Sequence, residues 1–168
     1  MSRLRTTAVT VALLLTATLT SCATAAHNTP PPPVITYTDP YVIDGDTIDA
    51  YDPGGNETRI RILGIDAAED SKYASECGGA DATAALTQLL TDQPALTLIT
   101  DDTQPERDKY GRVLGYLELA DGTDIGLRMI ELGLAEELTI GHPHARQHDY
   151  QDVQQAAAAA PVGVWANC

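Results

Sequence analysis

The chain has 168 residues, with 10 Lys and Arg against 24 Asp and Glu, a formal net charge of -14, and no Phe. This length allows one ordinary domain with appendages, and the apolar and charged fractions exclude wholesale disorder. Only one apolar stretch is long enough to be considered for a membrane, which excludes a multi-span membrane protein. The acidity, taken alone, argues against a nucleic-acid partner, because the phosphate backbone attracts basic surfaces.

The first segment has the pattern of an export signal. Arg3 and Arg5 precede an apolar run over residues 8–19, which is short for a transmembrane helix and typical of a secretory signal. The run ends in Leu19-Thr20-Ser21-Cys22, which resembles the lipobox of bacterial lipoproteins. We therefore expect residues 1–21 to be a signal peptide and Cys22 to carry the lipid. The alternative is a plain signal peptide cut elsewhere, with Cys22 incidental.

A proline-rich tether follows. Four consecutive prolines, residues 30–33, favour extended polyproline II. We expect residues 22–33 to hold a folded domain, residues 34–168, off the outer face of a bacterial cell membrane, or the protein to be secreted. Removal of residues 1–21 takes away two Arg and no acid, which leaves the mature chain at a charge of -16.

The predicted elements of the domain follow in chain order. Alternating and β-branched residues predict strands over 34–37, 41–43, 47–51, 58–65, 95–100 and 113–119, with an Asp44-Gly45 turn after the second. Helical spacing of apolar residues predicts helices over 79–90, 124–134 and 149–160. This order fits a β-barrel with helices (α+β): an OB-fold, with a five-stranded antiparallel barrel and three helices. We expect a monomer.

Two cysteines, Cys77 and Cys168, remain after Cys22. An even remainder in an exported protein indicates a disulfide between them; the alternative is two free buried thiols. Because Cys168 is remote in sequence from the acidic motifs described next, we expect the bridge to contribute stability and not chemistry.

Four motifs are each uninformative alone but together indicate a chemical site. They are Asp44-Gly45-Asp46-Thr47, Arg61, Asp66-Ala67-Ala68-Glu69, and Arg107-Asp108-Lys109-Tyr110-Gly111-Arg112. Carboxylates bind a hard cation such as Ca²⁺, and Arg forks bind phosphate oxygens with two donors. A further carboxylate can activate or position water. Such a set can hydrolyse a phosphate ester.

These residues are similar to those of the thermonuclease family, the secreted calcium-dependent nucleases of staphylococcal nuclease type. The resemblance runs from about residue 34 to Trp165. It includes Ile43 to Thr47, the spacing from Arg61 to Asp66 to Glu69, Asp108 to Arg112, Gly133-Leu134-Ala135, and Trp165.

The resemblance implies a role for each matching residue. Asp46 and Asp66 would be side-chain ligands of Ca²⁺, and Ala67 a ligand through its carbonyl. Glu69 would be the general base or would position the water. Arg61 and Arg112 would bind the scissile phosphate, and Lys109 and Tyr110 a neighbouring one. The implied enzyme is an endonuclease that hydrolyses DNA and RNA and leaves 3′-phosphates.

The chain departs from the family pattern in three respects. Ala68 stands where many members have Pro, which frees φ and loosens Glu69. Thr139 stands where the staphylococcal enzyme has a substrate-contacting Tyr. The acidity is the largest departure, although six of the eight basic residues of the mature chain lie between residues 59 and 112. We expect weak ground-state binding with the chemical step intact.

Three other interpretations were weighed. A non-catalytic OB-fold binding module on the cell surface is possible in principle, because a fold does not give a function, but the retained arginines and Glu69 argue against it. A glycosidase using Asp66 and Glu69 as its carboxylate pair is disfavoured by the scarcity of aromatic residues. His142, His144 and His148 could suggest a transition-metal site, but their position near Pro143 predicts solvated loop residues.

Overall fold

A computed structural model describes residues 32–70 and 75–168. The predicted signal peptide, residues 1–21, and Cys22 lie outside the described residues, as does most of the predicted tether, residues 22–33. Those predictions therefore stay predictions. None of the helices in the described part of the chain has the length and apolar character needed to cross a membrane.

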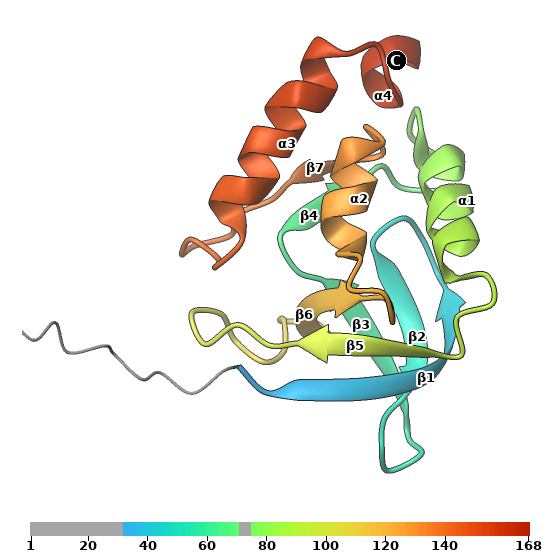
Figure 1. Ribbon diagram of the computed structural model, residues 1–168, viewed down its shortest axis with the longest axis vertical. Coiled ribbons are helices and arrows are strands. Elements are labelled where there is room, and N and C mark those ends of the chain that lie inside the picture. The colour runs from blue at the N-terminus through green and yellow to red at the C-terminus, as the bar shows by residue number, and fades with distance from the viewer. Residues whose placement is uncertain (1–31, 71–74) are drawn as a thin grey trace, which may run out of the picture. The chain divides into compact units, whose positions relative to one another are not determined.

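Five strands close into a barrel in the order β1-β2-β3-β6-β5 (Figure 1). They are β1 (Val34–Val42), β2 (Thr47–Tyr51), β3 (Glu57–Ile62), β5 (Ala95–Ile99) and β6 (Val113–Glu118). Alternation sends one face of each strand inward, and the barrel interior is filled by fully buried side chains that include Ile48, Ile60, Leu96, Leu98 and Leu117. The predicted OB-fold barrel is thereby confirmed.

One strand pairing differs from the all-antiparallel prediction. β3 and β6 pair in parallel, with Arg61 opposite Leu114, whereas the other four pairings of the barrel are antiparallel. Parallel neighbours need a long crossover, and here the chain between β3 and β6 contains a helix and β5. Hydrophobic alternation within a strand does not report the direction of its neighbour, so the sequence did not reveal this.

The strand predicted over residues 58–65 is divided in two. β3 ends at Ile62, a turn at Leu63 and Gly64 follows, and β4 (Ile65–Ala67) then pairs outside the barrel with β7 (Ala135–Glu137). Gly64 has φ +84°, a left-handed conformation that suits glycine. This turn sends Asp66 and Ala67 away from the barrel wall.

The described residues also form four helices: α1 (Gly79–Leu90), α2 (Ile125–Glu131), α3 (Gln147–Ala159) and the single turn α4 (Val164–Asn167). α2 packs against both α1 and α3 (Figure 1). Asp124 caps α2 by accepting a hydrogen bond from the Leu127 amide at 3.0 Å. The bounds of α1 match the prediction, α2 is shorter than predicted, and β7 and α4 were not predicted.

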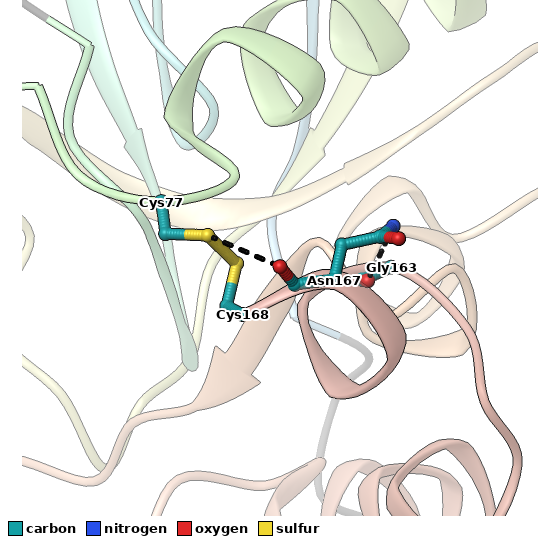
Figure 2. The surroundings of a disulfide bond; sticks show 4 residues. All are labelled: Cys77, Gly163, Asn167 and Cys168. Carbon is teal, nitrogen blue, oxygen red and sulfur yellow. Dashed lines mark hydrogen bonds between the residues drawn. A yellow bond between two sulfur atoms is a disulfide. The ribbon is translucent and has the colours of Figure 1, made fainter.

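The C-terminal residue is covalently attached to the chain just before α1. Cys77 and Cys168 form a disulfide with Cα atoms 5.9 Å apart, the pairing expected from the sequence (Figure 2). The Cys77 Sγ also lies 3.8 Å from the carbonyl oxygen of Asn167. The bridge ties α4 to the N-terminal end of α1.

Candidate active site

The turn between β1 and β2 positions Asp46. The amide of Asp46 donates to Asp44 Oδ1 at 3.1 Å, and the carbonyl of Asp46 accepts from the Ile62 amide at 2.9 Å. Gly45 has no room for a side chain, since a Cβ there would lie 2.6 Å from the Cβ of Ala67 and 2.7 Å from the Cβ of Ala82. The turn is therefore held directly against β4 and α1.

The Asp46 carboxylate is almost fully buried, with the residue 5% exposed. Its Oδ1 accepts from the Thr47 hydroxyl at 2.9 Å, and its Oδ2 accepts from the Ala67 amide at 2.9 Å. Arg61 Nη2 lies 2.9 Å from the same Oδ2. Burial raises the pKa of Asp46 to about 6, although the Arg61 charge and the Ala67 amide act in the opposite direction.

Arg61 joins the two aspartates. It lies on β3 opposite Thr47, with only 9% of the residue exposed. Its Nη2 contacts Asp66 Oδ1 at 2.8 Å as well as Asp46, and its Nη1 donates to the Ile65 carbonyl at 2.8 Å. One guanidinium nitrogen thus lies between two carboxylates, and the same side chain fixes the start of β4.

β4 places the remaining predicted ligands. Asp66 pairs with Glu136 of β7, and its side chain is 62% exposed, so one of the two carboxylates faces solvent. Ala67 pairs with Ala135 and is buried. Glu69 follows two residues later with an exposed side chain. The structure brings Asp46, Arg61, Asp66 and Ala67 into contact with one another. Glu69 lies on the segment that follows β4, two residues after Ala67.

Arg112 approaches the same turn from the other side. Its backbone and side chain both donate to Asp108, with Nε 2.6 Å from Oδ2 and the amide 2.9 Å from Oδ1. Its Nη1 lies 3.5 Å from the Thr47 hydroxyl, next to Asp46. Burial acts to raise the pKa of Asp108, but the hydrogen bonds from Arg112 and the Tyr110 amide, together with the Arg112 charge, outweigh it and lower that pKa.

Lys109 and Tyr110 lie in the exposed turn between Asp108 and Arg112. Tyr110 is 72% exposed, the Lys109 Nζ is 4.9 Å from its ring centroid, and the Arg112 guanidinium carbon is 5.4 Å from it. These are cation–π distances. The turn therefore presents an aromatic ring and the Lys109 cation to solvent, next to the partly buried Arg112.

The donor set fits a hard divalent cation. Two carboxylates, one of them buried with a raised pKa, already enclose a positively charged group, the Arg61 guanidinium. Carboxylate and carbonyl oxygens are the ligands that Ca²⁺ prefers. Within residues 32–70 and 75–168, no group of three or more His, Cys, Asp or Glu side chains is close enough to hold a metal, so the carbonyl of Ala67 and water would have to complete the shell.

The histidine prediction is wrong for His144. His142 and His148 are exposed, but His144 is only 4% exposed, because it packs against Gly64 and lies 3.0 Å from the Tyr116 hydroxyl through Nδ1. Its Nε2 lies 3.3 Å from Glu137 Oε1. His144 therefore belongs to a buried polar network that supports the turn before β4, which a loop rich in polar residues and proline did not indicate.

Sequence reasoning also missed two residues that position the site. Asp108 was noted only as part of a motif, yet it holds Arg112 in place. Glu76 was not singled out, yet its Oε2 accepts from the Glu69 amide at 3.0 Å. Neither carries a local signal, because an exposed acid in a loop is usually solvated.

Comparison with known families gives one match. The sequence model of the family described as "Staphylococcal nuclease homologue" matches residues 59–167, which contain Arg61, Asp66, Glu69 and Arg112. The matched segment is more than half of the chain.

Among individual relatives, two are named as nucleases and one is not. Endonuclease YhcR of Bacillus subtilis is 31% identical over 134 residues, which cover 74% of this chain and 11% of that protein. Thermonuclease of Staphylococcus intermedius is 36% identical over 98 residues, covering 57% of this chain and 52% of that protein. Succinoglycan biosynthesis protein ExoI of Rhizobium meliloti is 29% identical over 131 residues, covering 74% and 61%. The chain thus spans between about a tenth and three fifths of the lengths of these relatives.

Proposed function

The chain belongs to the family of staphylococcal nuclease homologues, and from this premise we propose that it is a calcium-dependent nuclease. It hydrolyses phosphodiester bonds in DNA and RNA, breaks the bond to the 5′ oxygen, and leaves 3′-phosphates. The observation that supports this most strongly is the cluster in which Arg61 joins Asp46 to Asp66 while Arg112 reaches Thr47 beside them.

The carboxylates hold the metal. Asp46, Asp66 and the Ala67 carbonyl would hold Ca²⁺, which would supply positive charge beside the scissile phosphate. Arg61 Nη2 then exchanges a carboxylate partner for a phosphate oxygen. A bound cation and the guanidinium therefore compete for the same two aspartates when no substrate is present.

The arginines bind the reacting phosphate. Hydrolysis develops extra negative charge on the phosphoryl oxygens, and the N–H donors of Arg61 and Arg112 stabilise that charge. Arg112 is already oriented for this contact. Asp108 binds its Nε at 2.6 Å, and its Nη1 is directed toward Thr47, next to Asp46. Such fixed donors need little reorganisation as the charge develops.

Glu69 acts on the water. It accepts the proton of the attacking water, or orients that water, while the new bond to phosphorus forms and the bond to the 5′ oxygen breaks. Lys109 and Tyr110, exposed in the turn before Arg112, contact a neighbouring phosphate.

We further propose that the mature protein is tethered outside the membrane by lipid on Cys22 and works as a monomer. Two or more acyl chains give stable anchoring, and the proline-rich segment gives reach. Fractionation of cells that express Cys22→Ala tests the anchor: release of the protein, or failure to process it, supports the anchor. A processed variant that stays in the membrane contradicts it.

A binding module without catalysis is the second candidate, because one relative is named as a succinoglycan biosynthesis protein and not as a nuclease. One experiment separates the two. The mature chain, residues 22–168, is incubated with plasmid DNA and with RNA in Ca²⁺ or in EDTA, and the product ends are analysed. Fragments with 3′-phosphates in Ca²⁺ alone support the nuclease, whereas binding with no cleavage supports the module.

A further inference from the structure

The segment that carries Glu69 is closed by the residues just before α1. Asp70 and Ser75 form an antiparallel bridge, and the Glu76 amide donates to the Glu69 carbonyl at 2.8 Å. In return, the Glu69 amide donates to Glu76 Oε2 at 3.0 Å. One residue, Glu76, therefore satisfies both the backbone N–H and the backbone C=O of Glu69.

The start of α1 packs onto the same backbone. A Cβ on Gly79 would lie 2.3 Å from the Glu69 carbonyl oxygen and 3.1 Å from that of Ala68. The Gly79 amide also donates to the Glu76 carbonyl at 3.1 Å. The backbone of Glu69 thus lies between Glu76 and Gly79, the first residue of α1, where only glycine fits.

The disulfide begins at the next residue. Cys77 follows Glu76 directly and is bonded to Cys168, at the end of α4 (Figure 2). On the adjacent residue, Gly78, a Cβ would lie 2.5 Å from Val164 Cγ1, so α4 is packed closely against this part of the chain. α4 is itself attached to the body of the domain, because the Val164 amide donates to the Gly133 carbonyl at 2.9 Å.

The disulfide and two of the predicted metal ligands, Asp66 and Ala67, line one cleft of about 530 Å³. Asp66, Ala67 and Ala68 form part of its wall, and Glu76, Cys77 and Cys168 form another part. Sequence distance alone led to the expectation that the bridge contributes stability and not chemistry. The structure places the bridge beside the segment that carries Glu69. Distance in sequence is therefore no reason to separate the disulfide from the chemistry of the site.

We propose that Glu76 is a positioning residue for Glu69, and that the Cys77–Cys168 disulfide holds Glu76 in place. The proposal rests on the nuclease function and on the role of Glu69 in it. Glu76 does not touch the substrate: it fixes the backbone from which the Glu69 carboxylate reaches the water. Small misplacements of a reacting group cost large factors in rate, so loss of this contact lowers kcat more than it changes KM.

Two substitutions at Glu76 test the contact. Glu76→Ala removes the acceptor for the Glu69 amide, whereas Glu76→Gln keeps an oxygen at that place. Glu57→Ala, at an exposed position at the start of β3, removes the same charge elsewhere and is the control. We expect Glu76→Ala to lower kcat by about tenfold or more with KM nearly unchanged, and Glu76→Gln and Glu57→Ala to keep most of the activity.

The double variant tests whether Glu76 acts through Glu69. In a Glu69→Gln background, Glu76→Ala is expected to add little further loss, because the group that it positions is already inactive. The pair Cys77→Ala with Cys168→Ala is expected to lower kcat in the same direction as Glu76→Ala, at a temperature where circular dichroism shows it folded, and to leave Ca²⁺ affinity unchanged. Equal kcat in the wild type, in Glu76→Ala and in the protein without the disulfide would overturn the proposal.

Amide hydrogen exchange gives a readout that needs no activity. Exchange of the Glu69 amide is expected to accelerate in Glu76→Ala and in the protein without the disulfide, and to stay slow in Glu76→Gln and Glu57→Ala. An unchanged Glu69 exchange rate in Glu76→Ala would overturn the proposal as well. If the wild type does not cleave nucleic acid, the proposed function fails, and this comparison alone decides whether Glu76 holds Glu69.

Discussion

Arg61 has two separable roles, because the same Nη2 that would bind phosphate lies at 2.9 Å and 2.8 Å from two carboxylates. Arg61→Ala is expected to lower the rate of hydrolysis by at least about 10²-fold, the usual loss for one electrostatic partner of a transition state. In the absence of substrate, however, Ca²⁺ affinity should rise, since a competing cation has left the aspartates.

The control for that pair of effects is Arg59→Ala. Arg59 lies two residues earlier on β3 and forms an exposed ion pair with Asp49 at 2.8 Å, so the variant removes the same charge from the same strand. Calorimetric titration with Ca²⁺ is the measurement. A weaker Ca²⁺ affinity in Arg61→Ala than in Arg59→Ala would show that Arg61 organises the ligands and does not compete for them.

Asp46 makes Ca²⁺ binding dependent on pH. Its pKa is raised to about 6 by burial, although Arg61 and the Ala67 amide lower it in part. The protonated form is favoured by folding, so the contribution of this group to stability is complete below the normal pKa near 3.8 and is lost as the pH rises through about 6. Metal binding needs the carboxylate, so Ca²⁺ affinity should rise with pH over this window, by about tenfold between pH 5 and pH 7.

Titrations with Ca²⁺ at several pH values measure this dependence, and Asp46→Asn is the matched variant in which it should disappear. An affinity that is constant from pH 5 to pH 7 in the wild type would mean that the Asp46 carboxyl is already ionised at pH 5, or that Asp46 is not a ligand.

The sequence identified most of these residues by resemblance, and the structure shows why resemblance was needed. Asp46 lies in the turn just before β2, whose first residue, Thr47, pairs with Arg61 on β3, but Asp66 joins them only because Gly64 turns the chain out of the barrel. Glu76 could not be identified, since its contact with Glu69 spans seven residues and is made to a backbone amide. Contacts of that kind leave no periodicity.

At the scale of elements, the contact between the β1–β2 turn, β4 and α1 leaves no room for a side chain at Gly45. Gly45→Ala would bring a Cβ to 2.6 Å from Ala67 and 2.7 Å from Ala82, and both neighbours are alanine Cβ atoms that cannot move without their backbone. We expect a loss of about 1–3 kcal/mol in stability and weaker Ca²⁺ binding, because β4 carries Asp66 and Ala67.

Gly54→Ala is the control for Gly45→Ala. It lies in the next turn, where a Cβ would meet only side-chain atoms of Asn56 and Asp52 at 3.0 Å and 3.1 Å. Thermal unfolding and Ca²⁺ titration of both variants are the measurements. Equal melting temperatures and equal affinities would show that the turn does not fix the position of β4.

Elements were predictable where a local pattern fixes them. β2 and α1 have the predicted bounds because alternation and the spacing of alanine and leucine mark them. β7 has only three residues, Ala135 to Glu137, with no alternation, and forms because β4 offers it a partner. α4 is likewise defined by contacts with Gly133 and by the disulfide, not by its own four residues.

At the scale of the whole molecule, the net charge of -14 repels a polyanionic nucleic-acid substrate. Nucleic-acid binding ordinarily weakens with salt through the release of counterions. Here salt also screens the repulsion between an acidic protein and its polyanionic substrate. Activity at fixed Ca²⁺ should therefore fall less steeply with salt than that of a basic relative, or rise first.

The measurement is the initial rate of DNA hydrolysis over a salt series, made in parallel on this protein and on a basic member of the family. A steep monotonic fall from low salt would show that local basic residues such as Lys109 and Arg112 dominate the field that the substrate meets.

The chemical step itself is tested most directly by the rate of phosphodiester hydrolysis in Glu69→Gln relative to wild type, at saturating Ca²⁺ and with folding and Ca²⁺ binding verified on the same sample. This change keeps the shape of the side chain and removes the group that accepts the proton or orients the water. We predict a loss of at least about 10²–10³-fold. A folded, Ca²⁺-binding Glu69→Gln protein that cleaves DNA at nearly the wild-type rate would contradict the proposed mechanism.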